Sequence, residues 1–172
     1  MKESKFLKEN TENLEKLLII PGLQEFDLKD LGSILRRSKI RQYDNEEQII
    51  QEGDHDALLF FLLSGGVRIE KGGKKITVLK RRGDMFGEMS IIDSSDRTAS
   101  AFAEGKAVCL TTDASKIEDL SKNDRVAFGY ILYRIFTEIL AERLRKTTEK
   151  LIKAQEKIEQ LMAQKKSPSN AL

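Results

Sequence analysis

The feature that most constrains the fold of this chain is a helical hydrophobic pattern that runs without interruption from Ser121 to about Gln164. A helix of roughly 40 residues is ~60 Å long. The preceding part of the chain, about 120 residues, would form a body with a radius of gyration of only ~14 Å. We therefore expect the helix to extend beyond that body, so that its distal half needs another surface to pack on.

The distal half of this helix repeats apolar residues every seven positions, which is typical of a coiled coil. One row consists of Leu144, Leu151 and Ile158, and the other of Leu140, Thr147, Ala154 and Leu161. We expect a parallel homodimer through this C-terminal helix. Because three heptads are near the minimum for a coiled coil, a solvated helix lying on its own domain is the alternative.

The hydrophobic pattern of the residues before this helix changes its period near Ser38. Two stretches near the N-terminus, 4–19 and 27–37, have helical spacing. From Ser38 the period is close to two, and glycine-containing turns separate short segments typical of strands. We expect an α+β fold with an antiparallel, jelly-roll-like β-roll (a double-stranded β-helix). The expected parts are N-terminal helices over 1–37, the β-roll over 38–120, the dimerisation helix over 121–164 and a disordered tail over 165–172.

The composition excludes several classes of function. The chain of 172 residues has one histidine, His55, and one cysteine, Cys109, so a disulfide within the chain and a zinc site built from these residue types are excluded. We expect no metal. The net charge of +2 creates no strong field for nucleic acid. No apolar run reaches the ~18 residues of a membrane helix, and the charged N-terminus is unlike a signal peptide, so a cytoplasmic protein without membrane contact is expected.

The most informative segment is 83–99, which combines groups that suit a phosphate and a sugar. Gly87 allows a close approach to the backbone, and one helical turn over 88–92 would present N–H groups to an anion. The carboxylate of Glu88 only accepts hydrogen bonds, so it suits a sugar hydroxyl. Arg97 offers a planar fork of donors for phosphate oxygens.

Thr98, directly after this arginine, adds a hydroxyl donor. Together these residues fit a small ligand with one phosphate beside one ribose hydroxyl. The alternative is that Arg97 only pairs with Asp93 or Asp96 on a loop.

The stretches FGEMSI (86–91) and RTA (97–99) resemble the phosphate-binding cassette of the cyclic nucleotide-binding domain family. Ile50–Asp54 and Phe61–Gly65 are similar to the first strands of that family, and the resemblance covers about residues 20–165. It implies that Glu88 binds the ribose 2′-hydroxyl and Arg97 the cyclic phosphate. The other ligand-binding residues expected in the β-roll are Gly87, Met89, Ser90, Thr98 and Ala99, with Ile69 and Val78 as walls of the sugar and base.

The stretch 143–150 resembles the corresponding helix of bacterial catabolite activator proteins. This resemblance implies that Arg143, Thr147 and Thr148 also belong to the ligand site, with the two threonines at purines bound in the two subunits of a dimer. It favours cAMP, although Thr98 is compatible with cGMP as well. The alternative for Thr147 is a polar seam residue that sets the register of the helices.

We therefore expect a cAMP-binding regulatory sensor that dimerises and signals to a separate, unidentified effector protein. Ligand would bridge 87–99 and 143–148 and so shift the position of the helix. Catabolite activators continue into a DNA-binding domain, whereas this sequence ends at Leu172, so no DNA binding is expected. The alternatives are a cGMP sensor and a ligand-independent coiled-coil scaffold. An enzyme is the least expected class, because the site offers no base–nucleophile pair.

Overall fold

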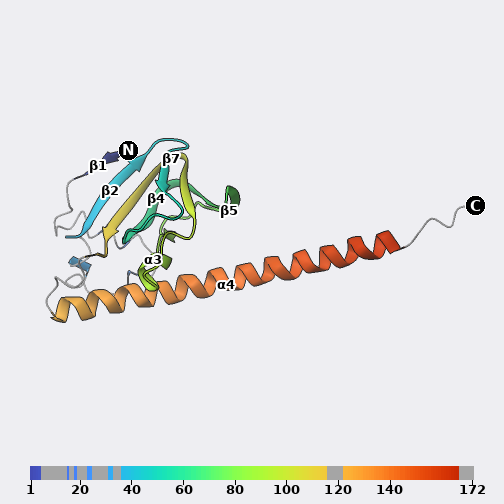
Figure 1. Ribbon diagram of the computed structural model, residues 1–172. Coiled ribbons are helices and arrows are strands. Elements are labelled where there is room, and N and C mark those ends of the chain that lie inside the picture. The colour runs from blue at the N-terminus through green and yellow to red at the C-terminus, as the bar shows by residue number, and fades with distance from the viewer. Residues whose placement is uncertain are drawn as a thin grey trace, which may run out of the picture. The chain divides into compact units, whose positions relative to one another are not determined.

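The computed structural model describes residues 1–4, 15, 18, 23–24, 31–32, 36–115 and 122–166 (Figure 1). The chain divides into two compact units, Met1–Ile135 and Phe136–Leu172. The elements in chain order are β1 (Lys2–Glu3), β2 (Ser38–Tyr43), β3 (Gln48–Ile50), β4 (Leu58–Lys71), β5 (Lys74–Leu79), β6 (Met85–Phe86), α3 (Met89–Ile92), β7 (Ser100–Asp113) and α4 (Lys122–Lys166).

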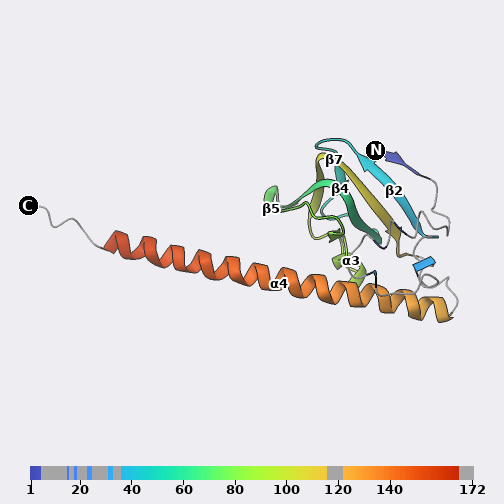
Figure 2. The ribbon, with the colours of Figure 1, turned by 180° about the vertical axis from the view of Figure 1, so that it is seen from behind.

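The strands form an antiparallel sheet in the order β1-β2-β7-β4-β5, with β3 paired to β7 and β6 paired to β4. Figures 1 and 2 show β2, β7 and β4 side by side from both directions. The β4–β7 ladder shifts register around Ser64. There Gly65, with φ +87°, comes so close to Lys106 that a Cβ would lie 2.1 Å from the Lys106 carbonyl oxygen. Such irregularities bend long strands. The antiparallel β fold predicted from the period of two is confirmed.

The N-terminal helices predicted over 4–19 and 27–37 lie almost entirely outside the described residues. The described start of the chain instead contains β1, a two-residue strand that the sequence did not predict. β1 pairs with β2, and the carboxylate of Glu3 accepts hydrogen bonds from Lys39 Nζ at 2.7 Å and Arg41 Nε at 2.5 Å. These two bonds lower the pKa of Glu3. β1 is therefore joined to β2 by its backbone pairing, and the two cross-strand ion pairs of Glu3 add to this contact.

The buried core of the unit that contains the sheet holds β6 in place, and β6 directly precedes segment 87–99. Its buried cluster draws on β2, β3, β4, β6 and β7 and comprises Tyr43, Ile50, Phe60, Leu62, Val67, Phe86, Ala101, Ala103, Ala107 and Cys109. The rings of Phe60 in β4 and Phe86 in β6 stack with centroids 5.0 Å apart. Burial raises the pKa of the Cys109 thiol to about 12. The stacked pair anchors β6, and with it the glycine that follows, against β4.

The C-terminal helix α4 has 45 residues, within two residues of the predicted bounds at each end. In the first compact unit its residues Ile131, Leu132 and Ile135 are buried. Among the described residues, no helix is both long and apolar enough to cross a membrane. The long C-terminal helix predicted from the sequence is confirmed.

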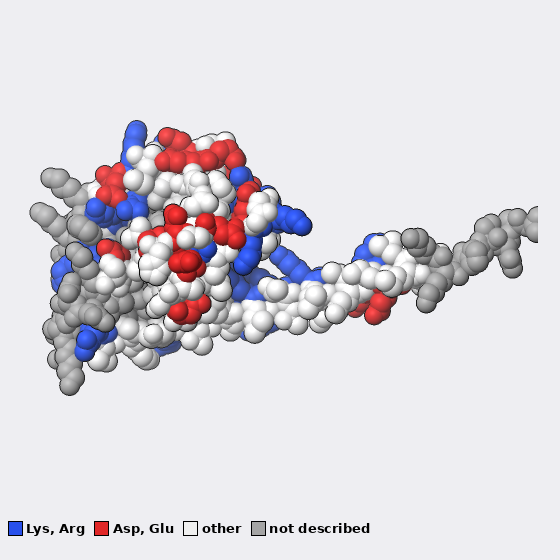
Figure 3. All heavy atoms as spheres, viewed as in Figure 1, with Lys and Arg blue, Asp and Glu red and all other residues white. Residues whose placement is uncertain are grey.

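The surface of the strands carries charges of both signs. Figure 3 shows acidic and basic side chains interspersed over the sheet unit. Several of them pair, as Arg68 does with Glu46 at 2.7 Å and Lys80 with Glu104 at 3.3 Å. Ion pairs at the surface contribute little to stability, so the stability of the fold does not depend on these pairs.

Candidate ligand-binding site

The candidate site begins at Gly87, directly after β6. Its φ is +81°, in the region that favours glycine. A Cβ added here would lie 2.7 Å from Nη1 of Arg97, 3.0 Å from the carbonyl oxygen of Leu58 and 3.3 Å from Cδ1 of Ile50. Glycine is therefore required both by the backbone conformation and by the close approach of Arg97.

Glu88 follows at the N-terminal cap position of α3. Its carbonyl oxygen accepts hydrogen bonds from the N–H groups of Ile91 and Ile92, both at 3.1 Å, which closes the single turn of this helix. Its side chain makes no capping hydrogen bond and is only 2% exposed. α3 has four residues, so its dipole is small. The group that distinguishes this position is therefore the buried carboxylate, which suits a hydroxyl donor.

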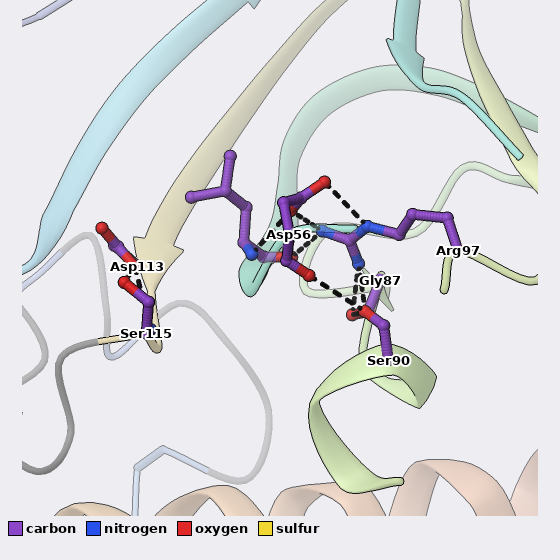
Figure 4. A network of polar contacts seen from close by, with 7 residues as sticks. Asp56, Gly87, Ser90, Arg97, Asp113 and Ser115 are labelled. Carbon is purple, nitrogen blue, oxygen red and sulfur yellow. Dashed lines mark hydrogen bonds and ion pairs between the residues drawn. The ribbon is translucent and has the colours of Figure 1, made fainter. Parts of the chain in front are cut away.

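Arg97 lies between α3 and β7 and is only 3% exposed. Its Nε donates to Asp56 Oδ2 at 3.1 Å, and its Nη2 donates to Asp56 Oδ1 and to the carbonyl oxygen of Leu58 at 2.6 Å. Its Nη1 donates to the carbonyl oxygen of Gly87 at 2.6 Å and to Ser90 Oγ at 2.9 Å (Figure 4). These five hydrogen bonds equal the number of N–H groups on a guanidinium.

The carboxylate that pairs with Arg97 is the one on Asp56, not that of Asp93 or Asp96. Asp96 instead lies 3.1 Å from Nδ1 of His55, and Asp93 accepts a hydrogen bond from the backbone N–H of Ser95 at 3.0 Å. The sequence alternative for Arg97 thus named the wrong aspartates.

The loop before β4 brings Asp56 to the arginine. The backbone N–H of Arg97 donates to the carbonyl oxygen of Asp54, and the N–H of Gly53 donates to that of Arg97, both at 2.8 Å. Asp56 and Arg97 are 41 residues apart, so no local spacing signals their contact. Sequence reasoning missed Asp56 for this reason.

The remaining cassette residues gather around the same point. The Ser90 hydroxyl, beside Arg97, lies 3.4 Å from the Gly87 carbonyl oxygen. The Thr98 hydroxyl lies 3.6 Å from Sδ of Met89, which is itself exposed, and Ala99 comes directly before β7. The structure therefore brings 87–90 together with 97–99.

The predicted wall residues Ile69 and Val78 do not share a face. Ile69 pairs with Thr77 and Val78 pairs with Arg68 across the β4–β5 ladder. Because neighbouring residues of a strand point to opposite faces, Ile69 and Val78 lie on opposite sides of this hairpin. Ile69 packs against the core cluster, and the contact of either side chain with a ligand stays a prediction.

The three predicted ligand residues of the C-terminal helix belong to the second compact unit. Thr148 donates from Oγ1 to the carbonyl oxygen of Leu144 at 2.9 Å. Thr147 and Thr148 are exposed, and Arg143 is half-buried. Their contact with a purine stays a prediction.

Comparison with known proteins places this site in a family. The family model of the cyclic nucleotide-binding domain matches residues 40–124. A CRP-like cAMP-activated global transcriptional regulator of Mycobacterium tuberculosis is 33% identical over 145 residues, which are 80% of this chain and 62% of the regulator. A cGMP-dependent protein kinase of Toxoplasma gondii is 30% identical over 108 residues, which are 63% of this chain but 10% of the kinase.

Solved structures give the same fold. A cyclic nucleotide-binding domain from Methylobacillus flagellatus matches with a TM-score of 0.70 at 20% identity, covering 83% of this chain and 84% of that domain. The chain thus spans less than two thirds of the two curated relatives but most of the solved domain. By the matching family model, the sheet topology and the cassette around Gly87, the chain belongs to the cyclic nucleotide-binding domain family.

Proposed function

We propose that this chain binds a cyclic nucleotide, cAMP in preference to cGMP, and acts as a regulatory sensor without turning the ligand over. The observation that carries the proposal is the burial of Glu88, the residue after Gly87, and of Arg97, whose Nη1 donates to the Gly87 carbonyl oxygen at 2.6 Å. A buried carboxylate supplies an acceptor for a ribose hydroxyl, and a buried guanidinium supplies the charge and fork that a cyclic phosphate needs. The family match supports this assignment.

The preference for cAMP rests on Thr147 and Thr148, in the stretch that resembles catabolite activator proteins. Among the relatives, the bacterial regulator is described as cAMP-activated and the kinase as cGMP-dependent. A cGMP sensor is therefore the second candidate, and the half-buried Thr98 beside Arg97 is compatible with both nucleotides, so it does not separate them.

Calorimetric titration of the full chain with cAMP, cGMP and 5′-AMP tests this function. We expect saturable binding of cAMP, weaker binding of cGMP, and far weaker binding of 5′-AMP, which lacks the cyclic phosphate. Tighter binding of cGMP would reverse the preference. Absence of binding by both cyclic nucleotides would overturn the function and favour the ligand-independent scaffold. Recovery of cAMP as AMP after incubation would contradict a pure sensor.

We further propose that a second copy of this chain pairs with it along α4 in a parallel coiled coil. The seam residues Leu144, Leu151, Ile158 and Leu161 are each more than half exposed. The same alternation of three and four residues continues toward the start of the helix through Val126, Tyr130 and Tyr133, which are also more than half exposed. At 100° per residue, this row lies opposite the buried Ile131, Leu132 and Ile135. One exposed apolar row on a single helix fits a partner with the same row.

In this proposal the effector is a separate protein, and the ligand controls it through α4. A cyclic nucleotide that binds more tightly when the helix is in one of two positions stabilises that position. Its differential affinity for the two helix positions sets how far the population shifts.

Replacing Leu151 by glutamate is expected to weaken the dimer by at least about a hundredfold, because each copy loses a buried leucine and the two carboxylates face each other. Ile152→Glu is the matched control: Ile152 is an exposed apolar residue of the same turn but lies outside the seam. Sedimentation velocity over a concentration series measures both. Equal dissociation constants for the two variants would place the dimer contact elsewhere.

A further inference from the structure

A regular row of basic residues runs along α4 within the second compact unit. It consists of Arg143, Lys146, Lys150, Lys153 and Lys157, at intervals of three, four, three and four residues. At 100° per residue these positions fall within an arc of about 80°, which adjoins the seam of the proposed coiled coil. We call this set the basic row. Its regular spacing places the cations on one face of the helix rather than all around it.

Glutamates form a separate row on the side of the basic row that faces away from the seam. They are Glu142, Glu149 and Glu156, seven residues apart. Figure 3 shows this separation toward the C-terminal end of the described helix, where basic side chains lie along one edge and acidic ones along the other. The basic row is therefore a narrow strip, with carboxylates on one side and the seam on the other.

Three members of the basic row form no ion pair within the described part of the chain. Lys146 is the exception, because its Nζ lies 2.6 Å from Oε1 of Glu142. Lys150, Lys153 and Lys157 are exposed, and no carboxylate of the described residues pairs with them. The chain itself therefore leaves much of the positive charge of the basic row without a counter-charge.

The proposed parallel dimer does not neutralise these lysines either. With Leu151 at position a of the heptad, Lys150 and Lys157 are at position g, where coiled coils commonly form ion pairs with position e of the other helix. The e residues opposite them are the partner's Gln155 and the partner's Met162, and neither is acidic. The surface of the dimer thus keeps two lysines at positions that usually have an acidic partner.

The spacing and the width of the basic row fit one helix with acidic side chains. Lys150 and Lys157 are about 10.5 Å apart along the axis, and acidic residues one heptad apart on a second helix have the same rise. A helix can contact the strip without covering the glutamate row. A nucleic acid or an anionic membrane is broader than the strip, so the glutamate row would repel it. The adjoining e row includes an apolar, adaptable methionine that adds a contact for a helix.

We propose that the basic row is the docking surface for the effector, and that the docking segment of the effector is an amphipathic helix with acidic residues one heptad apart. This inference rests on the proposed function, which it extends by giving the effector a chemistry. The twofold symmetry of a parallel dimer repeats the basic row on both sides of the coiled coil. Each dimer then binds two acidic helices, each between the basic row of one subunit and the uncharged e row of the other.

A fluorescent synthetic peptide of three heptads, with glutamates at the positions that would face the basic row, is the probe. Fluorescence anisotropy at low ionic strength measures its binding to the full chain. The control peptide has glutamine at the same positions. We expect saturable binding of one glutamate peptide per chain, at least roughly tenfold weaker binding of the glutamine peptide, and a loss of affinity as salt is added.

Replacing both Lys150 and Lys157 by glutamine should weaken binding of the glutamate peptide roughly tenfold, the effect of losing two partly covered ion pairs. The matched control replaces both Lys71 and Lys74 by glutamine. These are two exposed lysines of the sheet unit, so the control removes the same net charge and should change the affinity by less than about twofold. Both double variants should keep the wild-type dimer in sedimentation velocity and the wild-type affinity for cAMP, because none of the four lysines belongs to the seam or the cassette.

The outcomes separate the docking surface from the proposed function. Equal binding of the two peptides, or unchanged binding by the variant of Lys150 and Lys157, overturns the docking surface and leaves the sensor and the dimer standing. Tighter binding of a DNA duplex or of phosphatidylserine vesicles, with the same loss in that variant, overturns the choice of an acidic helix. A monomeric chain overturns the dimer and the docking surface together. Without binding of either cyclic nucleotide the sensor is overturned, whereas charge-dependent binding of the peptide would still support the docking surface.

Discussion

Replacing Arg97 by alanine is expected to lower the affinity for cAMP by roughly two to four orders of magnitude. The change removes the charged fork assigned to the cyclic phosphate, and loss of a buried charge partner costs about 3–5 kcal/mol. Stability should fall as well, because Asp56 loses its partner and the carbonyl oxygens of Gly87 and Leu58 lose their donors. Calorimetric titration measures the first effect and urea denaturation the second.

One further variant separates the effect of charge from that of shape at position 97, and a second variant, at another arginine, is the control. Arg97→Lys keeps the charge but lacks the planar fork, so its affinity should lie between those of the wild type and Arg97→Ala. Arg81→Ala is the control, because Arg81 is a largely exposed arginine of the same sheet unit. Affinity in Arg97→Ala equal to that of the wild type would remove Arg97 from the ligand site, whatever happened to its stability.

Replacing Gly87 by alanine is expected to lower both the free energy of unfolding and the affinity for cAMP. A residue with a Cβ at φ +81° is strained by roughly 1–2 kcal/mol. The Cβ would also lie 2.7 Å from Nη1 of Arg97 and 3.0 Å from the carbonyl oxygen of Leu58. Overpacking of this kind typically adds about 1–3 kcal/mol. Since one of the displaced groups is the guanidinium itself, ligand binding should weaken with stability.

Gly53→Ala is the matched control for this variant. Gly53 has nearly the same φ, +89°, but no atom of the described residues lies within 4 Å of an added Cβ. Both variants carry the backbone strain, and only Gly87→Ala carries the steric conflict with Arg97. Urea denaturation and titration of the two side by side isolate that conflict. Equal losses in both variants would mean that the space around Gly87 does not matter.

Local patterns predicted the helices and strands well where one hydrophobic period continues over many residues. The 3.6-residue period gave α4 within two residues at each end, because every turn of a long helix adds evidence for the same period. The alternation and glycine turns predicted antiparallel strands. β1 escaped prediction because two charged residues show no alternation, and its formation depends on Lys39 and Arg41 far along the chain.

The residues of the candidate site were predictable from the cassette motif, but the contacts that these residues make were not. Gly87, Glu88 and Arg97 follow from the cassette, since residue type and spacing are written in one short stretch. The faces of Ile69 and Val78 were not predictable, because they depend on the register of β4 against β5. That register shifts between Ile69 and Glu70, and one residue of shift exchanges the two faces of a strand.

The sequence by itself therefore determined the long exposed helix, the antiparallel strands and the pair of charged residues around Gly87, since each depends on neighbours within a few residues. Only the tertiary structure decided that the fork of Arg97 is occupied by Asp56. That contact joins positions 41 residues apart. It exists because the loop before β4 and the segment before β7 exchange backbone hydrogen bonds, and such long-range pairing is set by the whole sheet rather than by any local pattern.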